Sequence, residues 1–518
     1  MTWHAAKFLA FNSALLIAAA FAFFLFAAAP HRGETWLRQW GSRFRQHPVF
    51  GAFVRKHFIS HERSLVRLSI GIVVVAASGY EFVHILQGVL TDSKLTAADV
   101  RLHNTLRLFH SEALHRSYSA VTRLANAWFL VPLSIALAGL MYAARRRRDA
   151  LVLVAATFLP TIFAVVLKYL VNRPRPIEAR PFVSGPSFPS GHTLMATVVY
   201  GFIAYVILAD APKRRLAFVA VLALLTFIVL VPLSRVYLGV HWPYDTLASL
   251  ALGVALLAVL IEAMKSERLA RLQHDSPPWF AKSVAVFAGL TIIAAGFYAT
   301  ASVEKEVRPL SPQPVGVVSI DLLRQNFPPA LKRTSEDLVG GPMEPAAFVF
   351  DGDAAALVRS FQRAGWSLAD SPSATGLLHE LLCVIRDAPD PRGPATPSYY
   401  DGQPQDLTFE RPATATGSIR HRHHIRVWRE PLNILPAVPL WVATCSYDEG
   451  VKLVPKPYLL THRIDPRVDE ERELIASELR NAGVQDVVLV IVTGPRHGTN
   501  AGGDAFITDG RAHVMIFP

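Results

Sequence analysis

Cysteine is scarce in this sequence. Two thiols, Cys383 and Cys445, occur among 518 residues, and both lie in the C-terminal third of the chain. Two cysteines exclude a disulfide framework and a metal centre built from cysteine pairs. A single bridge between them is one expectation, which requires their Cα atoms to come within about 7 Å. Two buried free thiols are the alternative, because unpaired cysteine behaves as a small apolar residue.

The sequence also lacks two features that commonly bind phosphate or magnesium. Gly502-Gly503 has no P-loop pattern around it, so we interpret it as an ordinary loop. No acidic cluster accompanies the basic residues described below, so we expect no Mg²⁺ site there. The net charge of +12 would suit nucleic acid, but much of the excess lies in short clusters between apolar runs, which is typical of membrane topology. We therefore expect no nucleic-acid partner.

Long apolar runs are abundant before residue 302 and missing after residue 315. The sequence is 52% hydrophobic, with a mean hydropathy of +0.31. Since only helices satisfy their own backbone in lipid over segments of this length, the runs predict an all-α bundle of about eight transmembrane helices. They occupy about residues 6–29, 68–90, 126–144, 150–170, 193–210, 216–234, 244–264 and 280–301.

Basic clusters indicate which side of the membrane each loop faces. By the positive-inside rule they predict that four segments are cytoplasmic: residues 31–67, 145–148, 213–215 and 265–271. The loops at 168–192 and 234–242 then face the periplasm of a bacterial inner membrane. The loop at 92–125 lies on that side too, and it is a candidate cover for the other two.

Three polar runs interrupt the apolar stretch between Lys168 and Asp245. They contain three cations, two histidines and one carboxylate in fixed spacing: Lys168, Arg175, Ser190, Gly191, His192, Arg235, His241 and Asp245. Two guanidiniums can bind an oxyanion by paired hydrogen bonds, and Ser190-Gly191 stands where the N-terminus of a helix would offer backbone N–H groups. Asp245 falls one helical turn after His241, where it can hold one ring nitrogen. The set predicts phosphoryl transfer without a metal, although single Lys or Arg residues here could merely snorkel to lipid head groups.

The pattern K-x6-RP, PSGH and SR-x5-H-x3-D resembles the signature of the type 2 phosphatidic acid phosphatase superfamily. That superfamily includes bacterial acid phosphatases, lipid phosphate phosphatases and vanadium-dependent haloperoxidases. The resemblance covers about residues 66–265 and implies a six-helix core. It also implies that His241 is the nucleophile, Asp245 its partner and His192 the acid. Phosphate binding would fall to Lys168, Arg175, Ser190, Gly191 and Arg235, with no metal and no cofactor.

These features predict an integral-membrane phosphatase. The expected reaction is hydrolysis of a lipid phosphate or pyrophosphate monoester at the periplasmic face through a phosphohistidine. One alternative is a vanadate-dependent haloperoxidase, because a phosphate pocket also binds vanadate, although several membrane spans argue against that branch. The other is a non-catalytic scaffold that binds lipid phosphate, although such a site would need only the cations.

Residues 304–518 are expected to form a soluble α+β domain, which the count of membrane crossings places in the periplasm, on the same side as the loops at 168–192 and 234–242. Periodicity predicts helices at 354–365, 377–387 and 468–481, and strands at 424–428, 440–446, 451–455, 487–492 and 513–517. Asp448–Gly450 is expected to be the turn of a hairpin. The preceding organisation is an N-terminal helix with a basic segment (1–65), the phosphatase domain (66–275) and a further transmembrane helix (276–303).

This domain resembles the LssY-type C-terminal domain. The resemblance rests on His423–Trp428 and Thr461–Arg472 and covers about residues 320–480. Six side chains could be metal ligands: His421, His423, His424, His462, Asp465 and Asp469. The simpler interpretation is that alternation through 420–429 makes the polar face of a strand.

Overall fold

The computed structural model describes residues 62–179, 183–210, 215–264, 316–318 and 320–518, apart from short gaps between residues 372 and 493. The described chain forms two compact units. The membrane unit contains the helices before residue 265, except α5 (Lys94–Leu108). The C-terminal unit contains residues 316–518 together with α5.

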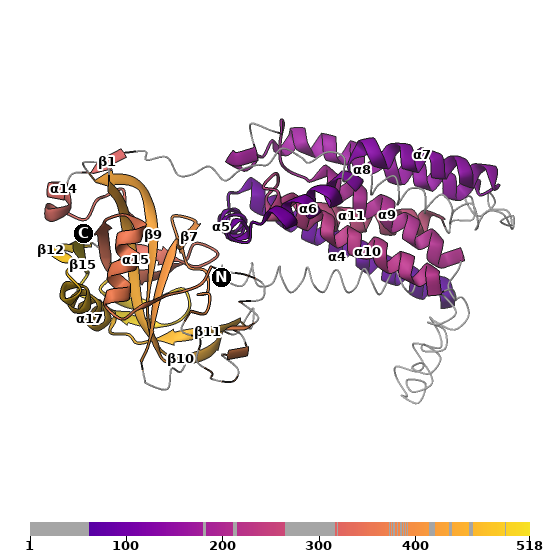
Figure 1. Ribbon diagram of the computed structural model, residues 1–518. Helices are drawn as coiled ribbons and strands as arrows, with labels where there is room; N and C mark the ends of the chain where they lie inside the picture. Colours follow the sequence, from indigo (N-terminus) through magenta and orange to yellow (C-terminus); the bar gives the residue numbers. More distant parts are fainter. Residues whose placement is uncertain are drawn as a thin grey trace, which may run out of the picture. The chain divides into compact units, whose positions relative to one another are not determined.

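The membrane unit is a bundle of apolar helices (Figure 1). It contains α4 (Glu62–Leu90), α6 (Glu112–Leu124), α7 (Ala127–Ala143), α8 (Arg147–Val171), α9 (Gly191–Asp210), α10 (Arg215–Tyr237) and α11 (Pro243–Met264). Five of these are long and apolar enough to cross a membrane, and a sixth span results if α6 and α7, bent by 42°, count as one. The runs expected at 6–29 and 280–301 lie outside the described residues, so the total of eight stays a prediction.

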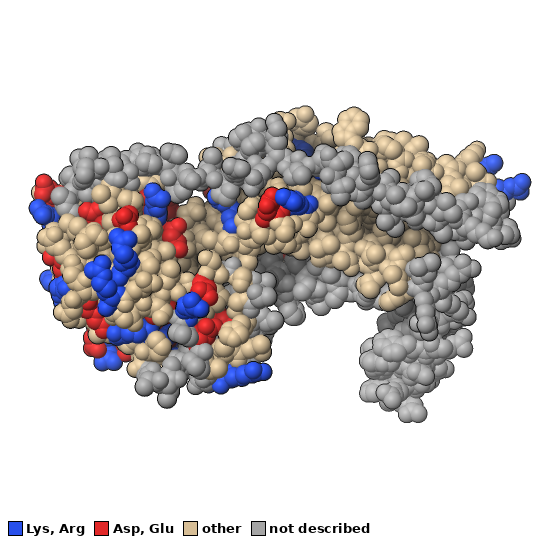
Figure 2. Space-filling model, in the orientation of Figure 1, with Lys and Arg blue, Asp and Glu red and all other residues tan. Residues whose placement is uncertain are grey.

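The surface of this unit suits lipid. Large apolar side chains are exposed along α8, including Phe158, Ile162, Val166 and Leu170. Figure 2 shows that the described surface of these helices is mostly uncharged. Contiguous exposed apolar surface of this kind is unusual on a protein surrounded by water and is typical of helices that face hydrocarbon.

Two glycines allow α9 and α11 to pack closely. A Cβ atom added at Gly253 would lie 2.8 Å from the Thr197 Cβ, and one at Gly201 would lie 2.4 Å from a Leu257 methyl. Small residues at such contacts let helix backbones approach in a membrane, where van der Waals packing drives association. The contact matters for function because Ser190 and His192 stand at the start of α9, while Asp245 stands at the start of α11.

The C-terminal unit is built on a nine-stranded mixed sheet. Its main path runs through β12 (Gln485–Ile491), β15 (Arg511–Ile516), β4 (Phe348–Asp351), β10 (Val438–Val454), β9 (Arg422–Ile434), β8 (Leu407–Pro412) and β5 (Ser367–Leu368). Two further strands join it, because β1 (Gly316–Val318) pairs with β9 and β11 (Leu459–Ile464) pairs with β10. A smaller sheet contains β3 (Pro342–Pro345), β2 (Thr334–Glu336), β6 (Tyr399–Tyr400) and β7 (Gln403–Pro404), and β13 (His497–Thr499) pairs with β14 (Ala505–Ile507).

The described residues of this unit include two large hydrophobic clusters. One gathers α15 (Ala354–Arg363) and α17 (Val468–Asn481) with the sheet, through residues such as Phe361, Ile475 and Phe409. The other contains Trp428 and Val442 together with Leu323 of the short α14 (Ile320–Gln325). This arrangement confirms the expected α+β class. The face of this unit that Figure 2 shows carries charged side chains of both signs.

The expected hairpin at Asp448–Gly450 is wrong. β10 continues through these residues, and its second half pairs with β11 in a ladder whose register shifts between Asp448 and Gly450. The glycine therefore marks a bulge inside a long strand, because a residue without a side chain is suited to such a kink. The helix predicted at 468–481 is confirmed, and the one at 354–365 ends slightly earlier.

Helix α5 packs with the C-terminal unit although its neighbours in sequence, α4 and α6, belong to the membrane unit. Arg101 forms a buried ion pair with Glu336 of β2. The Asn104 amide donates to the Gly402 carbonyl at 2.9 Å, and the Thr105 hydroxyl lies 2.7 Å from that of Tyr399. The loop at 92–125 therefore contains a helix that is anchored by polar contacts to the C-terminal unit.

Candidate active site

The eight residues singled out in the sequence stand at the ends of four helices of the membrane unit or in the loops beside them. Lys168 lies in the last turn of α8, and Asn172, directly after the helix, has a left-handed conformation. Ser190 directly precedes α9, and Gly191 and His192 are its first residues. Arg235 lies in the last turn of α10. Finally, α11 begins with Pro243, for which the missing N–H has no consequence in the first turn.

His241 lies between a carboxylate and a guanidinium. Its Nδ1 is 3.4 Å from the Asp245 Oδ2, and its Nε2 is 3.3 Å from the Arg175 Nη1. Burial lowers the pKa of the His241 imidazole to about 3. The ring is therefore neutral near pH 7, which is the form with a lone pair available to attack.

Asp245 is fully buried and makes several hydrogen bonds. The Arg173 Nη1 donates to its Oδ1 at 2.7 Å, and the Trp242 backbone N–H donates to its Oδ2 at 3.1 Å. The guanidinium of Arg173 also lies over the Trp242 ring at 5.6 Å. Since Oδ2 also faces His241, the carboxylate is fixed from both sides.

The basic side chains are held by backbone carbonyls. The Lys168 Nζ donates to the Pro186 carbonyl at 2.6 Å. Arg175 donates to the carbonyls of Gly185 and Val240 at 3.0 and 2.6 Å. The loop between α8 and α9 is thereby fastened around both cations.

Ser190 is buried at the N-terminal end of α9. Its carbonyl accepts from the Leu194 N–H at 3.0 Å, while its own N–H donates to the Ser249 hydroxyl at 2.7 Å. Its hydroxyl accepts from the Thr193 hydroxyl at 3.1 Å. The position before the helix is the predicted one, but the hydroxyl contacts a side chain instead of a helix N–H.

His192 shares this cluster. Its electrostatic neighbours are Arg235, His241, Lys168 and Arg175. Arg235 itself donates to the Thr122 hydroxyl of α6 at 2.7 Å. The structure thus brings together all the predicted cations, both histidines and the carboxylate.

Two residues in this cluster were not predicted. Arg173 could have been noticed, because it belongs to the repeated Arg-Pro of residues 173–176. Thr122 could not have been predicted, because nothing in the sequence around it indicates a contact with Arg235, 113 positions away.

The six candidate metal ligands of the C-terminal unit do not form one cluster among the described side chains. His423 pairs with Glu471 at 2.8 Å, and His424 lies 2.8 Å from the Ser446 hydroxyl. The Asp469 Oδ1 accepts from Thr508 and Arg472 at 2.8 and 2.9 Å. Asp465 accepts from Arg467, His421 is exposed, and the His462 side chain lies outside the described residues.

Of the two alternatives for Cys383 and Cys445, a bridge or free thiols, the structure shows the second. Both residues are buried free thiols. Cys445 packs in the hydrophobic cluster under α15 and α17, whereas Cys383 lies beside His379, at 3.7 Å from its Nδ1. The two sulfur atoms therefore lie in different surroundings, one apolar and one beside an imidazole.

Comparison with known families matches both parts of the chain. The PAP2 superfamily matches residues 149–268, and the LssY C-terminus matches residues 328–512. The first range contains all eight residues of the cluster.

Individual relatives are named as phosphatases or diphosphatases. Phosphatidylglycerophosphatase B of Bacillus subtilis is 32% identical over 183 residues, which cover 34% of this chain and 87% of that protein. The undecaprenyl-diphosphatase of Sulfolobus acidocaldarius is 32% identical over 23% of this chain and 58% of its own length. A crystal structure of a transmembrane PAP2-type phosphatidylglycerolphosphate phosphatase from Bacillus subtilis is 28% identical, covers 38% of this chain and 98% of that chain, and gives a TM-score of 0.35.

Proposed function

Because this chain belongs to the PAP2 superfamily of phosphatases, we propose that its membrane unit hydrolyses a lipid phosphate or pyrophosphate at the periplasmic face through a phosphohistidine. The observation that carries the proposal is the position of His241. One ring nitrogen faces Asp245 and the other faces Arg175, so the ring has an orienting carboxylate on one side and an anion-binding group on the other.

The first step forms the covalent intermediate. The His241 Nε2 attacks phosphorus in line with the departing oxygen, and the P–N bond forms as the P–O bond breaks. His192 gives its proton to the departing lipid alkoxide or phosphate. Asp245 stabilises the positive imidazole, as a buried carboxylate does in a hydrolase triad.

The second step releases phosphate. Water attacks the phosphohistidine, His192 takes a proton from it, and the P–N bond breaks to regenerate the neutral His241 ring. The negative oxygens are neutralised in both steps by Lys168, Arg175 and Arg235, and the N-terminus of α9 at Ser190-Gly191 supplies further hydrogen-bond donors. These side chains provide the positive charge that the chemistry requires.

The distribution of basic residues among the loops indicates which side of the membrane the site faces. The basic segments at 145–148 and 213–215 alternate along the chain with the loops that bear the site, which favours a periplasmic site under the positive-inside rule. The crossing expected at 280–301 places the C-terminus on the same side as the site, so an alkaline phosphatase fused after Pro518 should be active. Activity of a cytoplasm-only reporter at that point would contradict the assignment.

Turnover by the purified full-length protein tests the chemistry. Phosphate release would be measured from phosphatidic acid, phosphatidylglycerophosphate, undecaprenyl pyrophosphate and a lipid A phosphate. We expect turnover on at least one of them, inhibited by vanadate and retained in EDTA. An alkaline quench should trap a phosphorylated protein, since a phosphoramidate is stable in base.

Two variants separate the mechanism from general damage. His241→Ala should lose both turnover and trapped phosphate, whereas Arg116→Gln, which alters an exposed pair with Glu112 on α6, should keep both. Retention of more than roughly one per cent of turnover by His241→Ala would show that another group is the nucleophile.

A further inference from the structure

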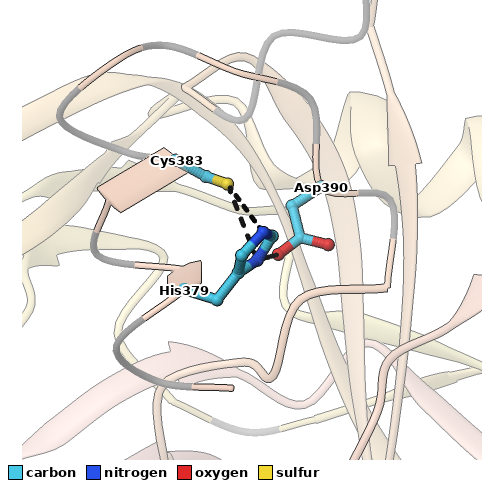
Figure 3. Close-up of side chains that lie close together, drawn as sticks. All are labelled: His379, Cys383 and Asp390. Atoms are coloured by element: carbon cyan, nitrogen blue, oxygen red, sulfur yellow. Dashed lines mark hydrogen bonds and ion pairs between the residues drawn. The ribbon is translucent and has the colours of Figure 1, made fainter. Parts of the chain in front are cut away.

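Three potential metal ligands meet in the C-terminal unit, far along the chain from the phosphatase motifs. The side chains of His379, Cys383 and Asp390 converge on one point (Figure 3). The Asp390 Oδ2 lies 3.1 Å from the His379 Nδ1, and the Cys383 Sγ lies 3.7 Å from the same nitrogen. One ligand atom of each residue lies within 4.8 Å of the others.

These separations suit a tetrahedral ion. With Zn–S of about 2.3 Å and Zn–N and Zn–O of about 2.0 Å, tetrahedral angles place sulfur and nitrogen about 3.5 Å apart and nitrogen and oxygen about 3.3 Å apart. The observed 3.7 and 3.1 Å differ from these two edges by about 0.2 Å, and the third edge, between sulfur and oxygen, is within 4.8 Å. The Cys383 Sγ also lies 3.9 Å from the His379 Nε2, so the thiol lies beside the imidazole ring whose Nδ1 faces the Asp390 carboxylate.

The local backbone explains how the three residues meet. His379 and Cys383 are four residues apart, in a segment where the described residues between 376 and 386 are helical, so their side chains share one face. The Ala388 N–H donates to the Cys383 carbonyl at 3.0 Å. This bond turns the chain at the end of the helical segment, so that Asp390 lies beside His379. Glu380 of the same segment pairs with Arg422 of β9 at 3.6 Å, which ties it to the sheet.

We propose that His379, Cys383 and Asp390 bind Zn²⁺ with an open fourth position. Imidazole, thiolate and carboxylate together favour zinc over the hard ions Mg²⁺ and Ca²⁺, which prefer oxygen. Cys383 is buried and the Asp390 side chain is 16% exposed, whereas that of His379 is 67% exposed. Two ligands are therefore fixed by the fold, and solvent or a ligand can reach the ion past His379.

Cobalt substitution gives a readout that does not depend on phosphatase activity. The full-length protein would carry an affinity tag without histidine, be stripped of metal, and be titrated with Co²⁺ and then Zn²⁺. We expect a thiolate-to-cobalt absorption band in the near ultraviolet that saturates at one equivalent and is abolished by Zn²⁺. Cys383→Ser should lose the band, while Cys445→Ser, which removes the other buried thiol of the unit, should keep it.

A second variant guards against misfolding. The His379 side chain is exposed, so His379→Ala should fold normally. It should weaken Zn²⁺ binding by at least roughly tenfold, because losing a residue that merely hydrogen-bonds to a metal ligand already has an effect of that size. No cobalt band in the unaltered protein, or a band that persists in Cys383→Ser, would overturn the proposal. Alkylation of Cys383 that depends on His379 but is unaffected by Zn²⁺ would also overturn it and would indicate a reactive thiol.

Discussion

The Arg173 guanidinium donates a 2.7 Å hydrogen bond to Asp245, on the carboxylate oxygen that does not face His241. Both side chains are buried. Arg173 thus connects the loop after α8 to the first turn of α11, at the residue that orients the proposed nucleophile. It is best described as a positioning residue, because its hydrogen bond goes to Asp245, which in turn faces His241.

Replacing Arg173 should therefore harm both stability and turnover. Arg173→Gln leaves a buried carboxylate without its cation, a change that costs about 3–5 kcal/mol in buried pairs. We expect a lower thermal unfolding temperature in detergent and a fall in kcat with little change in KM, with partial rescue by Arg173→Lys. Arg116→Gln is the control, since exposed pairs contribute no more than about 1 kcal/mol. A normal kcat in Arg173→Gln would exclude the positioning role.

His192 should matter most when the leaving group is poor. As general acid it protonates the departing oxygen, so His192→Ala should lower turnover of a lipid phosphate by roughly 10²–10⁴-fold. An aryl phosphate with an acidic phenol departs without a proton and should suffer much less. The two substrates would be compared on the same preparation. Equal losses on both would assign His192 to phosphate binding instead of acid catalysis.

The buried His241 should make the protein less stable in acid. Its pKa of about 3 lies below the usual 6.5 because burial disfavours the charged ring. Between these values the unfolded chain binds a proton that the folded chain does not, so stability falls as the pH falls below 6.5, by up to about 2 kcal/mol at pH 5. His241→Asn cannot take up this proton, and its unfolding temperature should decline less between pH 7 and pH 5. An identical decline in both proteins would show that His241 is not responsible.

Local spacing was enough to predict which residues of the membrane unit lie together, but not the residues that support them. The motif residues around His192 and His241 are separated by spacings that suit helix ends. The apolar residues of 468–481 repeat with the period of a helix. The motif residues and this helix could therefore both be found in the sequence. By contrast, the contact between Arg235 and Thr122 joins residues far apart in sequence. Such a pair leaves no periodic trace.

The failed prediction at Asp448–Gly450 has a different origin. An acidic residue followed by glycine between two apolar runs is a strong turn signal, yet the same residues also suit a bulge. Which of the two forms depends on whether a partner strand is available along the whole length. Here β9 and β11 supply partners for the two halves of β10, so the strand continues.

Substitution at Gly253 should separate the two helices that carry the site. A side chain at this position would meet Thr197 at 2.8 Å, closer than real contacts allow, so Gly253→Val should push α11 away from α9. Overpacking of this kind costs typically about 1–3 kcal/mol. We expect a lower unfolding temperature and reduced turnover. Gly139→Val in α7 is the matched control, since nothing lies within 4 Å of a Cβ added there. Equal effects of the two variants would show that valine in a helix causes the loss and that the contact with Thr197 does not.

The ion pair between Arg101 and Glu336 should hold α5 to the C-terminal unit. Both side chains are largely buried, and Lys332 reaches the other oxygen of Glu336 at 2.6 Å. Arg101→Gln should loosen α5 by about 3 kcal/mol, which corresponds to roughly 100-fold faster amide hydrogen exchange across residues 94–108. Exchange in α17 serves as the internal reference and should stay unchanged. The charge-swapped pair Arg101→Glu with Glu336→Arg should restore part of the protection, whereas unaltered exchange in Arg101→Gln would show that Asn104 and Thr105 hold the helix without it.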